Sequence, residues 1–193
     1  MRIENAEQLK AAVGQASGLL QEIQYYAKRK KVSPPKVTFP SGYLRTAEQA
    51  RQKLKFISSR DLKCNLSYTM MLADVQRWIL TRTTLDSIAR EMVIKLQLSL
   101  FGNMVESITI DYLRGQHGKG QSYKDRTAYM VVNEIILDSL REDLDWLWDM
   151  RNDIHLDGVR ESEWNCGKYT DANYRRGIKA FGCLLDALGD PEQ

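Results

Sequence analysis

The feature that most constrains the fold is residues 85–113, where apolar side chains fall on nearly every side of a helix. They recur at steps of three and four, the spacing that places side chains on one face of an α-helix. Because further apolar residues fill the other faces near its middle, such a helix is expected to be surrounded by protein. We therefore predict a long helix at the centre of a bundle. Its apolar positions are Ile88, Met92, Val93, Leu96, Leu100, Met104, Val105 and Ile108.

Similar spacing, together with helix-start and helix-stop residues, predicts further helices over 5–31, 46–58, 66–81, 127–157 and 171–188. Thr83 or Thr84 is expected to cap the central helix, and Ser139 with Glu142 forms a capping box that divides the 127–157 segment. No segment alternates apolar and polar residues between turn residues, as a half-buried strand does. The predicted fold class is therefore all-α, a bundle of six or seven helices.

Two prolines divide the chain into a small and a large part. Val32-Ser33-Pro34-Pro35 ends the first helix, because proline cannot continue a helix and disfavours helical backbone in the residue before it. Residues 1–45 are predicted to form an N-terminal helix and a proline-rich connection packed on the core. Residues 46–193 are predicted to form the helical bundle.

Composition excludes several classes of protein. The apolar runs are far shorter than the ~20 residues of a membrane span, and the N-terminus lacks the apolar stretch of a signal peptide. The three cysteines are far apart and form no C-x-x-C pair, so reduced thiols in a cytoplasmic protein are expected. With only two histidines and no H-E-x-x-H helix, no metal and no cofactor are predicted.

Charge is distributed unevenly along the chain. Residues 1–63 hold 13 Lys/Arg against 5 Asp/Glu, and the remainder holds 15 against 20. A basic N-terminal third could contact phosphates, or it could pair with the acidic helix at 138–153 within the chain or across a dimer. A basic loop between Arg114 and Arg126 also contains three glycines. It is either a mobile surface connection or a flap that contacts phosphates through Arg114, His117, Lys119 and Lys124.

Two polar residues extend an apolar helix face late in the chain. Leu140, Leu144 and Leu147 form one stripe, and further steps of four reach Arg151 and His155. A charged group on a face expected to be buried needs a partner or a purpose. One alternative is structural, in which a carboxylate on a neighbouring helix pairs with the arginine and the histidine caps the helix end. The other is a functional site.

A helical bundle with Arg151, Asn152 and His155 near the end of its penultimate helix resembles the HEPN superfamily. Only three residues separate the arginine from the histidine, one fewer than the shortest usual spacing in that family. The resemblance implies a metal-independent endoribonuclease, often a homodimer whose two motifs face one cleft. It also implies an acidic residue facing the motif, and Glu106 in Gly102-Asn103-Met104-Val105-Glu106 is similar to that position.

The chemistry implied for this site requires few groups, because RNA supplies its own nucleophile, the 2′-hydroxyl beside the scissile phosphate. His155 is expected to act as general base or acid, and Arg151 to stabilise charge on the phosphate. Asn152 is expected to orient one of them, with Glu106 and Asp153 in support. The implied partners are RNA and a second copy of the chain, with no membrane. The alternative is a catalytically silent bundle that binds RNA or protein.

Overall fold

The structure, a computed structural model, describes residues 2–40, 42–116, 120, 122–152 and 167–189. Over these residues it contains seven helices and no strand, which confirms the all-α bundle. The chain forms two compact units, Met1–Pro40 and Ser41–Gln193. The expectation that the first packs on the second stays a prediction. Among the described helices, none is both long enough and apolar enough to cross a bilayer.

The first unit is built on one helix, α1 (Ala6–Lys30). The side chain of Asn5 accepts a hydrogen bond from the backbone N–H of Gln8, which satisfies one of the free donors of the first turn. Three cations, Lys28, Arg29 and Lys30, occupy the last turn, where they complement the helix dipole. The helix ends at Lys30, and the next residue, Lys31, adopts the left-handed conformation (φ 54°).

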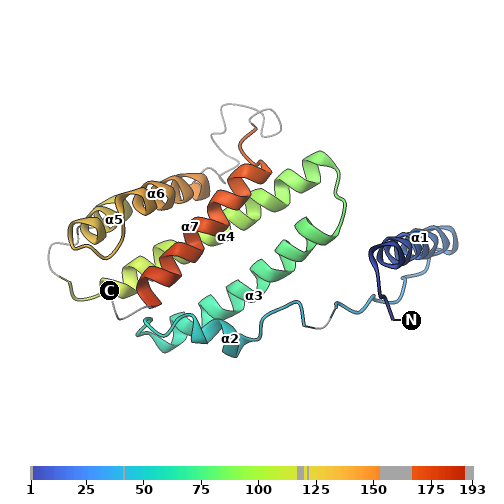
Figure 1. Cartoon of the computed structure of the whole chain (residues 1–193), viewed down its shortest axis with the longest axis horizontal. Helices are drawn as coiled ribbons and strands as arrows, with labels where there is room; N and C mark the ends of the chain where they lie inside the picture. Colours follow the sequence, from blue (N-terminus) through green and yellow to red (C-terminus); the bar gives the residue numbers. More distant parts are fainter. Residues whose placement is uncertain (1, 41, 117–119, 121, 153–166, 190–193) are drawn as a thin grey trace. The chain divides into compact units, whose positions relative to one another are not determined.

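The second unit holds the remaining helices (Figure 1): α2 (Ala47–Gln52), α3 (Arg60–Arg82), α4 (Ser87–Tyr112), α5 (Tyr123–Val132), α6 (Asp138–Asn152) and α7 (Asp171–Gly189). As its apolar pattern predicts, α4 is central: it packs against α3, α5, α6 and α7. Its side chains Leu98, Val105 and Ile108 are fully buried. The other helices do not cover α4 on all sides, because Ile88 and Leu96, both expected in the core, are exposed.

Three helix boundaries differ from those that the sequence predicts. Helix α3 begins at Arg60, six residues before the expected start, because the Ser59 side chain accepts a hydrogen bond from the N–H of Leu62. Helix α4 is preceded by Asp86, whereas Thr83 instead ends α3 by donating its hydroxyl to a carbonyl of that helix. Helix α2 ends at Gln52, short of the predicted end near residue 58.

The segment predicted as one divided helix over 127–157 is two separate helices. Helix α5 already begins at Tyr123, because Ser122 and Asp125 form a reciprocal capping box. The chain turns between residues 133 and 137, where Glu134 adopts a positive φ of 58°. Helix α6 then begins at Asp138, so Ser139, the expected cap, lies inside its first turn.

Candidate functional site

The predicted stripe of α6 does face the core, and it ends at an arginine held by three partners. Leu144 and Leu147 are fully buried against the other helices. One turn further on, Arg151 donates from Nε to Oδ1 of Asn103 on α4 (2.7 Å). Its Nη1 donates to Oδ1 of the adjacent Asn152 (2.9 Å), and its Nη2 lies 3.1 Å from Oε2 of Glu106 on α4.

A glycine on α4 allows this approach. A Cβ atom added to Gly102 would lie 2.6 Å from Cβ of Arg151 and 3.1 Å from the carbonyl oxygen of Leu147. Such distances are shorter than ordinary van der Waals contact, so no other residue fits without a shift of α6. The short sequence 102–106 therefore has two functions in the structure: Gly102 admits the arginine, and Asn103 and Glu106 hold it.

The structural alternative is met in part, because a carboxylate on a neighbouring helix, that of Glu106, pairs with Arg151, but the pair is neither buried nor bidentate. The side chain of Arg151 is 32% exposed and that of Glu106 is 26% exposed, so the ion pair is reached by solvent. Each guanidinium nitrogen has a different partner. Contacts with the described residues involve three of the five N–H groups of the guanidinium, so these residues leave two donors for another acceptor.

Glu106 is itself held from the side by an aromatic pair. Nε1 of Trp148 on α6 donates to its Oε1 (3.4 Å), and the ring of Tyr123 stacks on the indole with centroids 5.2 Å apart. The Tyr123 hydroxyl donates to the carbonyl of Leu144 (3.2 Å), and burial raises the pKa of this phenol. Helices α4, α5 and α6 are thus joined beside the arginine, which keeps the carboxylate in place.

The charge near Arg151 is mixed rather than strongly basic. Lys124 on α5 pairs with Asp149 on α6 (3.0 Å), and both side chains are more than half exposed. Asp145 on α6 accepts a hydrogen bond from Thr127 (2.7 Å). Burial raises the pKa of Asp145, and this effect outweighs that hydrogen bond and the nearby cations. The two aspartates therefore place negative charge beside Lys124.

The structure brings together only part of the predicted site. Arg151, Asn152 and Glu106 meet. Lys124 lies within α5 and not in a loop as predicted, because that helix begins at Tyr123. Arg114, expected to contact phosphates, pairs with Asp111 at 3.0 Å. The other predicted site residues lie outside the described residues: His117, Lys119, Asp153 and His155.

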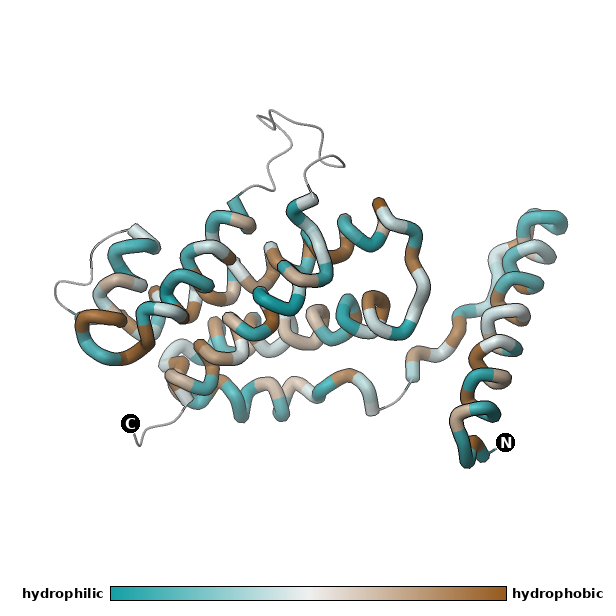
Figure 2. Tube along the Cα trace, turned by 45° about the horizontal axis from the view of Figure 1, so that its top comes forward, coloured by the Kyte–Doolittle hydropathy of each residue, from teal (hydrophilic) through white to brown (hydrophobic). Residues whose placement is uncertain are grey.

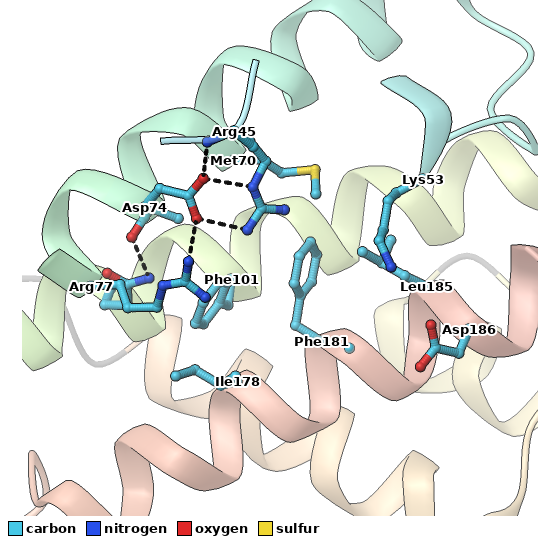
Figure 3. Close-up of a pocket in the computed structure, with 13 residues that line it drawn as sticks. Arg45, Lys53, Met70, Asp74, Arg77, Phe101, Ile178, Phe181, Leu185 and Asp186 are labelled. Carbon is cyan, nitrogen blue, oxygen red and sulfur yellow. Dashed lines mark hydrogen bonds and ion pairs between the residues drawn. The ribbon is translucent and has the colours of Figure 1, made fainter. Parts of the chain in front are cut away.

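Sequence reasoning missed a pocket of about 250 Å³ on the other side of α4, between α3 and α7 (Figure 3). Its wall is mainly apolar and includes Met70, Phe101 and Phe181, with Lys53 and Asp186 at one end. The buried Oε1 of Gln97, which also lines the pocket, has no hydrogen-bond partner among the described residues.

Asp74 lies at the end of this pocket away from Lys53 and Asp186 (Figure 3). Its Oδ2 accepts hydrogen bonds from the backbone N–H and Nε of Arg45. Its Oδ1 accepts one from Nη2 of Arg45 and lies 3.4 Å from Nη2 of Arg77. Burial alone would raise the pKa of this carboxyl, but the hydrogen bonds and charges of the two arginines outweigh burial and hold the pKa below its usual value. Because Arg45 is 29 residues from Asp74 in sequence, no local pattern indicates this pair.

Over the described residues, no cluster of histidine, cysteine and carboxylate side chains has the composition to hold a metal ion. Cys64 and Cys183 are free, half-buried thiols. Comparison with protein-family models, with curated proteins and with solved structures found no match to this chain.

Proposed function

We propose that the chain binds single-stranded RNA at Arg151 and cleaves it without a metal ion. The observation that supports this most is that Asn103, Glu106 and Asn152 hold the guanidinium of Arg151, whose side chain is 32% exposed. An arginine whose orientation is fixed before the ligand arrives loses little freedom on binding a phosphate. Its remaining N–H groups are of the kind that stabilises charge on a phosphate in the transition state.

The proposed roles follow the order of the residues along the chain. Arg151 contacts the scissile phosphate, and His155, four residues later, moves the proton of the 2′-hydroxyl or of the leaving oxygen. Asn152 uses its carbonyl oxygen on the arginine, which leaves its NH2 group for the phosphate. Glu106 positions the arginine, and Asp153 supports the histidine. A second copy of the chain completes the cleft, as the resemblance to HEPN proteins implies.

The cations near the site are proposed to bind the RNA strand on either side of the cleaved bond. Lys124 is available for this role, because its pair with Asp149 is exposed and such pairs contribute only about 0–1 kcal/mol. Exchange of that carboxylate for a phosphate therefore costs little. Arg114 is also exposed, although its partner Asp111 is buried, and His117 and Lys119 follow it in the sequence.

The test is cleavage of a mixed-sequence single-stranded RNA in EDTA. Wild type is expected to cleave, and Arg151→Ala/His155→Ala is expected to be inactive. Arg141→Ala, which removes an arginine of the same helix that pairs with Asp138, serves as the matched control and is expected to cleave as wild type does. An RNA with 2′-deoxy sugars should remain intact, because it lacks the nucleophile. Equal cleavage by wild type and the double variant would refute the catalytic assignment.

A second candidate function is a catalytically silent module that binds RNA, and one observation favours it. Glu106 contacts the arginine, and Asp149 and Asp145 add negative charge along α6, which opposes the approach of several phosphates at once. Such a module would bind a fluorescent RNA without cleaving it, and Arg151→Ala would weaken the binding. No cleavage by wild type, together with salt-dependent binding that requires Arg151, would favour this function over the first.

A further inference from the structure

Helix α1 carries apolar residues along its length (Figure 2), and most of them are exposed. Leu9, Val13, Leu20 and Ile23 are 51%, 57%, 50% and 39% exposed, and Ala27 is the only buried residue of the helix. A single amphipathic helix draws most of its stability from packing of its apolar face. Two glycines within α1 add a cost of about 1 kcal/mol each relative to alanine. The stripe therefore needs a partner.

The spacing of the stripe identifies the kind of partner. Its positions alternate steps of three and four over three seven-residue repeats, which is the pattern of a two-stranded coiled coil. A surface helix that packs on a globular core follows a period nearer 3.6 and has a broader apolar face. At about 1.5 Å per residue, α1 is ~37 Å long, enough for such a pairing. The positions are Ala6, Leu9, Val13, Ala16, Leu20, Ile23 and Ala27.

The sizes of these side chains indicate an antiparallel pair of identical helices. If Leu20 of one copy faces Ala16 of the other, the same register places Leu9 against Ala27 and Val13 against Ile23. Each of these three layers then pairs a large residue with a small one, or two of intermediate size, which fills the space between the two helices evenly. A parallel pair would place each alanine against itself and leave gaps between layers of facing leucines.

The charges at the two ends of α1 indicate the same orientation. Glu4 and Glu7 lie at its start, and residues 28–31 are four consecutive cations. In a parallel pair the cations of both copies would lie side by side and repel each other. In an antiparallel pair the cations of one copy lie near the glutamates of the other, and the helix dipoles also oppose each other favourably.

A hollow beside the end of the helix fits this register. Ile23, Tyr26, Ala27 and Val32 line it together with the two prolines that follow, and its volume is about 440 Å³. The antiparallel register brings the first turns of the second copy, with the leucine at position 9, to this end. We propose that α1 joins two copies of the chain as an antiparallel coiled coil, through an element separate from the Arg151 site.

The first experiment measures the mass of the full chain by sedimentation over a range of concentrations. Leu20→Glu places a charge between the two paired helices, and Gln21→Glu places the same charge one residue away, on the side of α1 that faces away from its partner. Wild type and Gln21→Glu are expected to be dimers, and Leu20→Glu is expected to dissociate at least tenfold more readily. A wild-type monomer at high concentration, or equal dimerisation of all three chains, would overturn the proposal. A monomer destabilised by Leu20→Glu would show that α1 packs within its own chain.

A second experiment tests the orientation. Oxidation of Val13→Cys/Ile23→Cys should give a disulfide-linked dimer, because these positions face each other in the antiparallel register. Val13→Cys alone should stay unlinked, since its two copies would lie ~15 Å apart along the axis, beyond the reach of a disulfide. Wild type, which holds the same three natural cysteines, is the control for disulfides that these cysteines form. Efficient linkage of Val13→Cys alone would contradict the antiparallel pairing.

Discussion

Replacement of Gly102 by alanine tests whether close contact between α4 and α6 sets the position of Arg151. The added methyl would lie 2.6 Å from Cβ of Arg151, whereas carbon atoms in contact are about 3.5–4.0 Å apart. The atom that it meets is bonded directly to the backbone, so rotation of the arginine side chain cannot relieve the clash. Helix α6 must therefore move away by about 1 Å, and the arginine with it.

The expected size of the effect comes from two opposing contributions. Overpacking of a tight contact costs about 1–3 kcal/mol. Alanine in place of glycine within a helix returns up to about 1 kcal/mol. Gly182→Ala in α7 provides the matched control, because a Cβ there meets no atom within 4 Å and only the favourable contribution remains. The free energies of unfolding of the two variants should therefore differ by about 1–3 kcal/mol.

Thermal and urea unfolding of the two variants measure this difference. For a chain of this size, 1 kcal/mol corresponds to about 2–4 °C in Tm. Gly182→Ala should raise Tm slightly, and Gly102→Ala should leave it several degrees below that of the control. RNA cleavage by Gly102→Ala should also fall, because a shifted Arg151 loses its contacts with Asn103 and Glu106. Equal stabilisation by both substitutions would show that α4 and α6 do not approach closely at Gly102.

Three further substitutions give expected outcomes of different sign. Asp74→Asn should lower Tm at pH 7, because the folded state holds the pKa of this carboxyl below its usual value. The stability that the charged carboxyl contributes is complete above pH ~4 and is lost as pH falls through the folded pKa. The Tm difference from wild type should therefore shrink in acid. Asp145→Asn should instead raise Tm at pH 7 or leave it unchanged, because burial raises the pKa of Asp145 and its charged form is disfavoured in the folded state. This gain in Tm should vanish below pH ~4. A clear fall in Tm at pH 7 would contradict the prediction. Glu106→Gln should slow RNA cleavage at constant RNA affinity if the carboxylate positions Arg151, and tighter binding without cleavage would support the silent module.

The parts of the fold that the sequence predicts are those encoded by local periodicity. The apolar residues on all sides of α4 predict its central place, and the stripe of α6 predicts that Arg151 faces another helix. The sequence predicts the start of a helix less well where polar residues follow the residue that caps it. The Ser59 cap of α3 precedes several polar residues, and the box at Ser122 closes with an aspartate and not with the more usual glutamate or glutamine.

The candidate site was predictable only in part, because contacts between helices depend on how closely their backbones approach. The sequence indicates Glu106 as a partner of the motif, but it does not reveal that Gly102 admits the arginine or that Asn103 binds its Nε. The pairing of Asp74 with Arg45, and the pocket beside it, likewise follow from the packing of α3 with the chain that precedes α2.

The most direct test of the proposed function is the initial rate of cleavage of single-stranded RNA in EDTA by wild type, Arg151→Ala and Arg141→Ala, measured side by side. The account predicts cleavage by wild type and Arg141→Ala and a loss of at least a hundredfold in Arg151→Ala, since one positioned donor to transition-state charge contributes about that much. Equal rates for Arg151→Ala and wild type, or no cleavage by any of the three, would contradict it.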